Sequence, residues 1–261
     1  MPSILDILRD PATLAVFALF AALAAWERIT PGRALPQVRG WNVRALLAFV
    51  LFLAVSIYLP LLLADWIAPL QLFDLSSWPT AAAAALGVLV YEFGAYAYHR
   101  SLHTFTPLWR AVHQMHHSAE RLDVPGAFWF GPLDMIGWSL LPALALTLLG
   151  LAAPAATAAA LFITFLGIFQ HANLRTPQWL GWFIARPEMH SLHHERGVHR
   201  FNYGDIPLWD MIFATYRNPT SWEGQAGFYD GASHRTLDLL IGRDVAGGEQ
   251  GFAKPATEGA A

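Results

Sequence analysis

The stretch from residue 45 to residue 64 reads ALLAFVLFLAVSIYLPLLLA. It carries no charge. As a helix it is long enough for the ~30 Å hydrocarbon core of a bilayer, which about 20 apolar residues cross. Four more apolar stretches lie at residues 12–26, 80–98, 133–153 and 155–170. Only Pro154 separates the last two, which predicts a helical hairpin. We expect an all-α integral membrane protein, a helical bundle of four to five apolar spans.

The composition supports a membrane protein and excludes several functions. Of the 261 residues, 55% are hydrophobic and 13% are charged, whereas about 25% of the residues in ordinary soluble domains are charged. There is no cysteine, which excludes disulfides, iron–sulfur clusters and thiolate zinc sites. The net charge is −3 and there is no basic tract, so we expect no nucleic-acid partner.

Arginines predict the orientation of the bundle, because cytoplasmic loops carry an excess of positive charge. Residues 65–79, which follow the second stretch, contain no Lys or Arg. The loop between the first two stretches contains Arg28, Arg33, Arg39 and Arg44. We therefore expect that loop, and with it every histidine of the chain, on the cytoplasmic side.

The domain organisation is expected to be simple. Residues 1–243 form one membrane-embedded domain, with a cytoplasmic cap made of residues 99–131 and 171–243. Residues 244–261 lack aromatic clustering and periodicity, which predicts a disordered tail. The first apolar stretch is short for a full span. It is interpreted as an uncleaved anchor and not as a signal peptide, since Asp6 and Asp10 outweigh Arg9 ahead of it.

Nine of the eleven histidines fall into four segments. Residues 99–103 read HRSLH, residues 113–117 read HQMHH, His171 stands alone, and residues 190–194 read HSLHH. On a helix, positions i, i+3 and i+4 share a face, so HxxxH offers two imidazoles to a metal ion and HxxHH offers three. Neutral imidazole binds iron, copper, nickel and zinc, and nine ligands suit two ions better than one. The predicted ligands are His99, His103, His113, His116, His117, His171, His190, His193 and His194.

Other polar residues have weaker signals. His199 and His234 match no motif and are interpreted as packing or ordinary polar residues. Ligating imidazoles need an acceptor for their second ring nitrogen, and the candidates near the motifs are Asn173, Asp210, Asp123, Glu120 and Glu188. Asp210 could instead cap a helix or form a surface ion pair. Glu92 lies inside the third apolar stretch, where a carboxylate indicates either a functional role or a hydrogen bond to a neighbouring helix.

The histidine segments and their neighbours resemble the fatty acid hydroxylase superfamily, also called the sterol desaturase family, of membrane-bound di-iron oxygenases. The resemblance covers residues 91–217 and rests on separate blocks in family order. These blocks are Tyr98-His99-Arg100, Leu108-Trp109 before residues 113–117, Gln170-His171-Ala172-Asn173, Pro187 to His194, Asn202-Tyr203-Gly204 and Trp209-Asp210. The resemblance implies two irons, O2, a lipid substrate, an external electron donor, and hydroxylation or desaturation of an unactivated C–H bond.

Three departures from the family pattern refine this expectation. The fatty-acyl branch has two histidines in the third block, whereas this chain has only His171, and that branch tends to HxxxxH in the first block, where this chain has HxxxH. Both differences favour the sterol desaturase and alkylglycerol monooxygenase-like branch. Many relatives also have a histidine directly before Pro132, where this chain has Gly131, and this puts the substrate or an outer contact of the metal site in doubt.

The residues leave several functions open. A lipid hydroxylase and a lipid desaturase would need the same site. A zinc-dependent membrane hydrolase would need a base beside a metal-bound water; HExxH is absent, although Glu195 follows His194. A metal transporter would place its ligands near the bilayer midplane, whereas these histidines cluster at one face.

The electron donor and the location are also expectations. The chain has no GxGxxG motif and no remaining length for a haem or flavin domain, so electrons are expected from a separate protein of the cytochrome or ferredoxin type. Fifteen Arg against one Lys suggest a GC-rich bacterial gene. We therefore expect the protein in a bacterial plasma (inner) membrane.

Overall fold

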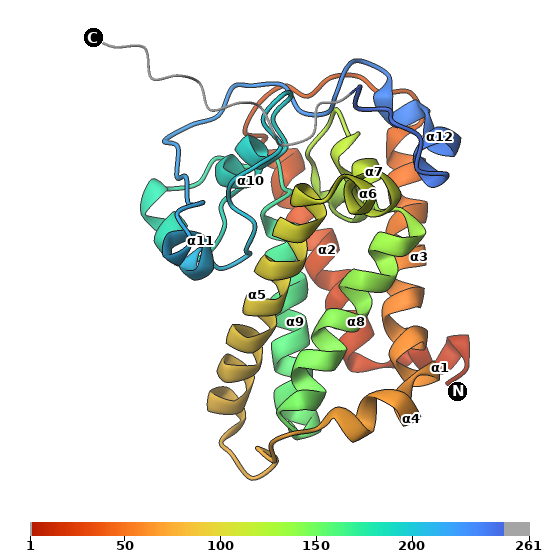
Figure 1. Cartoon of the computed structure of the whole chain (residues 1–261), viewed down its shortest axis with the longest axis vertical. Coiled ribbons are helices and arrows are strands. Elements are labelled where there is room, and N and C mark those ends of the chain that lie inside the picture. Colours follow the sequence, from red (N-terminus) through yellow and green to blue (C-terminus); the bar gives the residue numbers. More distant parts are fainter. Residues whose placement is uncertain (1, 248–261) are drawn as a thin grey trace.

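The computed structural model describes residues 2–247. The regular secondary structure of this part of the chain is helical apart from one isolated bridge between Glu195 and Ala226, and turns and loops connect the helices. The long helices stand side by side, and short helices and loops form a cap at one end (Figure 1). The fold class predicted from the sequence, an all-helical membrane protein with a histidine-rich cap, is confirmed. The long helices are α2 (Pro11–Ile29), α3 (Trp41–Leu62), α5 (Thr80–Thr104), α8 (Pro132–Leu148) and α9 (Ala153–Phe169).

Each apolar stretch of the sequence forms one of these helices. By length and hydropathy, α2, α3 and α5 can cross a membrane, whereas α8 and α9 are shorter apolar helices. α2 is longer than the predicted stretch 12–26, because the Asp10 side chain caps its first turn and Pro11 occupies a position that needs no N–H donor. α5 continues past residue 98 to Thr104, so His99 and His103 lie on the same helix as the apolar residues of the bundle.

The helices pack as a closed ring. α3 packs on α8, α8 on α5, α5 on α9, and α9 on α2. Phe20 of α2 stacks on Phe49 of α3 with ring centroids 4.3 Å apart, which closes the ring. Phe49 also stacks on Phe128 of the cap at 5.7 Å. Aromatic packing at the top of the bundle therefore fixes the cap over the ring.

The end opposite the cap is closed by the chain itself. The backbone N–H groups of Leu72 and Phe73 both donate to the carbonyl of Leu148, at the end of α8. Gly150 follows with φ +60°, and a Cβ there would lie 2.4 Å from the carbonyl oxygen of Phe73. The predicted hairpin is therefore a tight turn, after which α9 begins at Ala153 with Pro154 in its first turn. Three short helices complete this end: α1 (Ile4–Arg9), α4 (Ala64–Ile67) and η1 (Ala68–Leu70).

The cap is built from short elements on the chain between and after α5 and α9. Its α7 and α10 lie at the same end of the bundle (Figure 1). The predicted cytoplasmic side of this end remains a prediction. The elements are α6 (Thr106–Leu108), the π-helical turn η2 (Trp109–His113), α7 (Gln114–His117), η3 (Val124–Phe128), η4 (Gln178–Trp182), α10 (Pro187–His193), α11 (Leu208–Ile212), η5 (Ala232–His234) and α12 (Thr236–Leu240).

The start of the predicted disordered tail, residues 244–247, packs against the cap. The Gln114 side-chain oxygen accepts hydrogen bonds from the N–H groups of Val245 and Ala246, and Asp244 pairs with Arg110 at 2.6 Å. The rest of that tail, residues 248–261, lies outside the described residues. The ordered cap therefore extends a few residues beyond the predicted boundary at 243.

Candidate metal centre

The nine motif histidines converge into two buried groups. Within each group, one ring nitrogen per residue lies within 4.8 Å of the corresponding nitrogens of the other members. No exposed residue contributes to either group. Group A comprises His99, His103, His113, His117 and His193, and group B comprises His116, His171, His190 and His194.

The helical register divides each HxxHH motif between the two groups. His113 and His117 belong to group A, and His116 belongs to group B. Residues i and i+4, here His113 and His117, lie on one helix face. His116 is adjacent to His117, and adjacent residues on a helix are rotated by about 100° relative to each other, so His116 faces the other group. In the second motif, His190 and His194 belong to group B and the intervening His193 to group A. The expectation that HxxHH gives three ligands to one ion is therefore wrong: each motif gives two to one group and one to the other.

Distances within group B fit a shared metal ion and do not fit hydrogen bonds alone. The Nε2 atom of His171 lies 3.1 Å from that of His116 and 3.0 Å from that of His190, and the Nε2 atom of His190 lies 3.0 Å from that of His194. Each Nε2 has one in-plane position, holding either a proton or a lone pair, so these three contacts cannot all be hydrogen bonds. Two nitrogens each about 2.1 Å from one ion, at a right angle, lie about 3.0 Å apart.

Group A presents free nitrogens to its own centre. The Nε2 atoms of His99, His103 and His113 are buried and have no hydrogen-bond partner. The Nε2 atoms of His117 and His193 lie 3.1 Å apart. Buried polar atoms are rarely left without a partner, so these orphaned nitrogens indicate a site for a cation that accepts their lone pairs.

Backbone carbonyls select the ring nitrogen that faces each centre. The Nδ1 atom of His99 lies 2.8 Å from the carbonyl oxygen of Tyr203, and that of His193 lies 2.7 Å from the carbonyl oxygen of Phe201. A carbonyl only accepts, so Nδ1 must carry the proton and Nε2 keeps its lone pair. His171 is held in the same way by the carbonyl of Gly167 at 2.7 Å. Such contacts orient metal-binding imidazoles.

Asp134 is a hydrogen-bond acceptor for a motif histidine, and it was not among the acceptors predicted from the sequence. The Oδ2 atom of this fully buried carboxylate accepts a 2.7 Å hydrogen bond from Nδ1 of His113. Asp134 lies in the first turn of α8, after Gly131 and Pro132. A carboxylate in the first turn of an apolar helix was its available signal in the sequence. A carboxylate–histidine pair of this kind raises the basicity of the ligand.

His199 is also placed differently from the expectation. It is fully buried, and its Nδ1 lies 3.0 Å from Nδ1 of His117. His199, Phe201 and Asn202 have positive φ values of 40°, 71° and 47°, which non-glycine residues adopt only where the surroundings compensate for the strain. This strained segment places the His199 ring and the Phe201 carbonyl against two group A histidines. The interpretation of His199 as an ordinary packing residue is therefore corrected, whereas His234 is exposed.

Two of the predicted acceptors, Asp210 and Asn173, bond to backbone groups near the histidines and not to the histidines themselves. Asp210 accepts hydrogen bonds from the N–H groups of Tyr203 and Gly204, at 2.9 and 2.8 Å. This holds Tyr203 so that its carbonyl reaches His99. A Cβ at Gly204 would lie 2.9 Å from the carbonyl oxygen of Ile206, so the turn requires glycine. Asn173 exchanges hydrogen bonds with the backbone of Arg33 and ties the loop after α2 to the chain beside His171.

The other candidates also stabilise the cap. Asp123 accepts from the indole N–H of Trp41 at 2.9 Å, and Glu92 accepts from the N–H of Ile206 at 2.9 Å. Glu120 accepts from the N–H groups of Gly231 and Ser233. Asp123 also accepts from the guanidinium of Arg121 at 2.8 Å. None of these three carboxylates accepts a hydrogen bond from a motif histidine. These carboxylates therefore affect the histidine groups only indirectly, by holding the cap segments in place.

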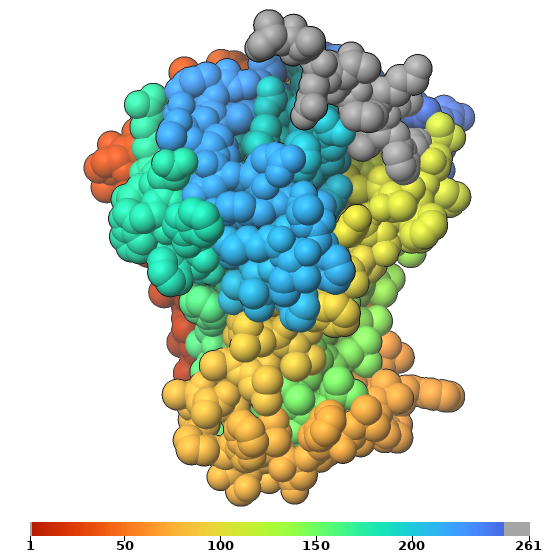
Figure 2. Space-filling model, turned by 60° about the vertical axis from the view of Figure 1, so that its left-hand side comes forward, coloured from red at the N-terminus to blue at the C-terminus, as the bar shows by residue number. Residues whose placement is uncertain are grey.

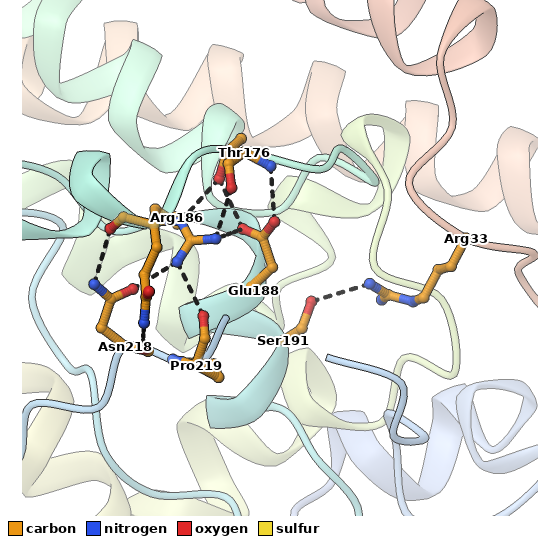
Figure 3. Close-up of polar contacts among 8 residues, drawn as sticks. Arg33, Thr176, Arg186, Glu188, Ser191, Asn218 and Pro219 are labelled. Atoms are coloured by element: carbon orange, nitrogen blue, oxygen red, sulfur yellow. Dashed lines mark hydrogen bonds and ion pairs between the residues drawn. The ribbon is translucent and has the colours of Figure 1, made fainter. Parts of the chain in front are cut away.

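A buried arginine fixes α10, the helix that carries His190 and His193 and is followed directly by His194. Arg186 precedes α10, is fully buried, and donates to the carbonyl oxygens of Thr176 and Pro219 and to the side chain of Asn218 (Figure 3). It also pairs with Glu188 at 3.1 Å. In the same view, Ser191 of α10 accepts from Arg33 (Figure 3). Polar contacts on the outer face of α10 thus leave its histidines facing inward.

Burial keeps the cap imidazoles neutral. Burial lowers the pKa of His171 to about 4, and the pKa values of His116 and His190 are lowered by burial and by neighbouring imidazoles. The same causes lower the pKa values of His193 and His194. Since metal binding requires the unprotonated ring, these rings offer lone pairs at neutral pH without first losing a proton.

A cavity of about 310 Å³ reaches from the histidines into the bundle. His116, His171 and His190 line it, and its walls further into the bundle are mainly apolar and aromatic, including Phe52 and Leu146. Its polar lining includes Tyr91, Ser56, Ser139, Thr164, Gln170 and Asp205. A long apolar molecule with one polar group fits a cavity of this character.

One polar position in this lining lacks an ion-pair partner. Asp205 is 8% exposed and accepts a 2.6 Å hydrogen bond from Gln170. No ion pair of Asp205 with a Lys or Arg occurs among residues 2–247. Burial raises the pKa of Asp205 to about 6, against the opposing effect of the Gln170 hydrogen bond. The cavity therefore offers a buried carboxyl group to a hydrogen-bond donor.

Comparison with known proteins agrees with this geometry. Residues 84–215 match the model of the fatty acid hydroxylase family. The chain is 33% identical over 147 residues to an ornithine lipid hydroxylase, OlsE, of Rhizobium tropici, covering 54% of this chain and 44% of that protein. It is 30% identical over 141 residues to a Delta(7)-sterol-C5(6)-desaturase of Nicotiana tabacum, covering 52% and 50%. The chain thus spans about half the length of these relatives. No solved structure matches it.

Proposed function

This chain belongs to the fatty acid hydroxylase family, and from that premise we propose that it is a membrane-bound oxidoreductase that uses O2 and two iron ions to hydroxylate a C–H bond of a lipid. The observation that carries the proposal is the pair of buried histidine groups at the mouth of an apolar cavity. Relatives that act on an ornithine lipid and on a sterol support a lipid substrate.

The donor set fits two iron ions. Imidazole nitrogen is a good ligand for iron, and groups A and B offer five and four imidazoles. Bound there, iron would supply the O2-dependent oxidation of an unactivated C–H bond. The balanced reaction is RH + O2 + 2e⁻ + 2H⁺ → ROH + H2O. Iron is favoured over zinc by the family.

The protein's own residues bind and orient the substrate. The apolar chain of the lipid would lie along Phe52, Trp138 and Leu146, which line the cavity. Its polar group would face Asp205 and Gln170, which line the same cavity as His171 and His190. Burial of the reacting carbon among these side chains excludes water.

Electrons and location complete the proposal. The electrons would come from a separate donor protein of the cytochrome or ferredoxin type. The histidine end would face the cytoplasm of a bacterial plasma membrane, and residues 1–243 would act as one domain. The match to a bacterial lipid hydroxylase and the three membrane-length helices support this location.

The test is a lipid analysis with a metal-site control. Lipids from cells that produce the wild-type chain are compared by mass spectrometry with lipids from cells that produce His116→Ala, both grown under isotopically labelled O2. We expect a lipid that is one oxygen atom heavier, carries the label, and is absent from the His116→Ala cells. Unchanged lipids despite a fully iron-loaded wild-type protein would contradict the proposal.

A desaturase is the second candidate, because one of the relatives is a sterol desaturase. It would use the same histidine groups and the same cavity. The lipid analysis distinguishes the two: a desaturase product is two hydrogen atoms lighter and carries no oxygen from O2.

A further inference from the structure

The cap carries an exposed apolar surface that is not explained by its own packing. We name it the shelf and define it as the exposed apolar side chains of residues 178–183 and 208–213. In η4, Trp179 and Trp182 are 62% and 61% exposed, and Phe183 after it is 64% exposed. In α11, Ile212 is 58% exposed. Large aromatic side chains rarely gather on a surface that faces only water.

The shelf carries no exposed charge. Residues 177–185 contain no charged residue, and the single one in residues 206–216, Asp210, is fully buried. The segments that flank these residues in the sequence do carry exposed charge, at Arg175 and Arg217. Aromatic residues flanked by arginine are typical of the level at which a protein meets lipid headgroups.

The shelf is continuous with the outer face of α5. Trp209 of α11 packs on Phe93 with ring centroids 4.7 Å apart, and Phe213 stacks on Tyr96 at 5.2 Å. Phe93 is itself half exposed on the membrane-length helix α5. In Figure 1, α11 lies lower than α10 and beside α5, and in Figure 2 the teal and blue cap segments stand directly above α5, which is gold. The shelf therefore lies where the cap meets the bundle surface.

An apolar groove lies directly beneath it. This groove of about 360 Å³ runs between α5 and α9 and is lined only by apolar side chains, among them Val88 and Phe162. Its upper wall is Ile206, in the segment that leads into α11. A groove of this chemistry on a bundle in a membrane fits a lipid acyl chain.

The shelf is also rigid. The hydroxyl of Tyr216 donates to the carbonyl of Gly181 at 3.0 Å, and Gln178 and Asn218 exchange hydrogen bonds at 2.9 Å. Trp182 packs on Tyr216 with ring centroids 5.5 Å apart. η4 and the chain after α11 therefore form one unit, so the apolar side chains cannot turn inward without breaking these contacts.

We propose that the shelf is embedded in the membrane leaflet on the cap side, with its aromatic rings among the lipid headgroups and upper acyl chains. The partner is the lipid bilayer itself, with an acyl chain in the α5–α9 groove below. The cap would then be a membrane-seated layer and not a domain suspended in water. This inference depends on the bundle crossing the membrane and not on the chemistry proposed for the metal centre.

The absence of cysteine allows a direct test. Single variants Trp182→Cys and Ile212→Cys carry a spin label on the shelf, Phe93→Cys serves as the lipid-facing reference, and Asp230→Cys, where the side chain is 95% exposed, serves as the aqueous reference. The full-length protein is reconstituted in phosphatidylcholine–phosphatidylglycerol vesicles. Collision rates of each label with O2, which concentrates in lipid, and with a water-soluble nickel chelate are measured by electron paramagnetic resonance.

We expect the ratio of O2 to nickel collisions at positions 182 and 212 to be several-fold higher than at position 230 and to approach that at position 93. An unchanged helical circular dichroism spectrum and an unchanged melting temperature show that each variant is folded. Ratios at both shelf positions equal to that at position 230 would overturn the proposal. An apolar partner protein on the shelf would give low collision rates with both reagents, which also overturns it.

Discussion

The imidazole rings of His117 and His194 stack with centroids 4.0 Å apart and planes inclined by 12°. The two residues come from different HxxHH motifs and belong to different histidine groups. The two groups are therefore neighbours in one buried core. Two ions held there would be close enough to act on one substrate molecule, the arrangement in which two metals share a reaction.

Removal of one ligand from group B should empty one of the two sites. In His116→Ala, three imidazoles remain in group B while group A keeps all five. We expect the iron content to fall from two ions towards one per chain and lipid oxidation to be lost. Elemental analysis of the purified protein measures the first effect and lipid mass spectrometry the second. His234→Ala, at an exposed position, should keep both, and an unchanged iron content in His116→Ala would contradict the assignment.

Asp134 should act on metal affinity through His113. Asp134→Ala removes the acceptor of the 2.7 Å hydrogen bond from Nδ1 of His113. Loss of such an outer partner typically weakens metal binding roughly 10–100-fold, and Asp134→Asn, which keeps an acceptor oxygen, should lose less. Iron release to a chelator competitor measures the affinity. Asp238→Ala, a matched change in an exposed ion pair, should leave the affinity unchanged, and equal affinities for the Asp134 variants and the wild type would refute the role.

His199 should position His117. In His199→Phe the ring volume is retained, but the acceptor 3.0 Å from Nδ1 of His117 is lost. We expect an iron affinity roughly 10-fold lower or worse, an altered Mössbauer spectrum of the iron that remains, and partial rescue in His199→Asn, because the amide oxygen can accept the same proton. A purely structural role would lower the melting temperature without changing the spectrum of the bound iron.

Asp205 should govern which lipids are oxidised. Asp205→Ala removes the buried carboxyl group but leaves the apolar walls of the cavity. We expect oxidation to decline most for lipids that carry an ammonium or hydroxyl group near the reacting carbon, since that group loses its acceptor. Mass spectrometry of lipid products gives the profile. Thr164→Val is the matched control, because the Thr164 hydroxyl already donates to the carbonyl of Ala160; an identical profile in both variants would contradict the proposed pose.

The metal-free protein should lose stability in acid. Burial lowers the pKa of His171 to about 4, from an ordinary value of 6.5. The folded chain therefore binds this proton more weakly than the unfolded chain. The contribution of the neutral ring is complete above pH about 6.5 and is lost as the pH falls towards 4. Thermal unfolding of the chelator-treated protein should show a melting temperature that drops across this window. The drop should be smaller in His171→Gln and unchanged in His234→Gln.

Much of the fold could be predicted from the sequence because the membrane makes simple demands. A charge-free run such as residues 45–64 has few other stable structures than a helix in lipid, and α3 occupies Trp41–Leu62. The ends of helices were less predictable. α5 continues beyond its apolar part to Thr104 because the cap supplies polar contacts, such as the Tyr203 carbonyl at His99, that no local pattern reveals.

The histidine set was visible for a similar reason, whereas its division into two groups was not. The i, i+4 spacing of His113 and His117 correctly pairs them, but the group that His116 joins depends on which helix faces it. His199 was missed because its backbone, at φ 40°, departs from any helical pattern. Asp134 was missed because it is separated from His113 by about twenty residues of intervening chain, and only tertiary packing joins them.

The metal content of the purified wild-type protein tests the central claim most directly. Elemental analysis combined with Mössbauer spectroscopy of protein prepared in membranes counts the ions and identifies their nitrogen ligands. The account predicts two iron ions per chain, both in nitrogen-rich environments, with loss of one in His116→Ala. Stoichiometric zinc without iron, or a single ion per fully loaded chain, would contradict it.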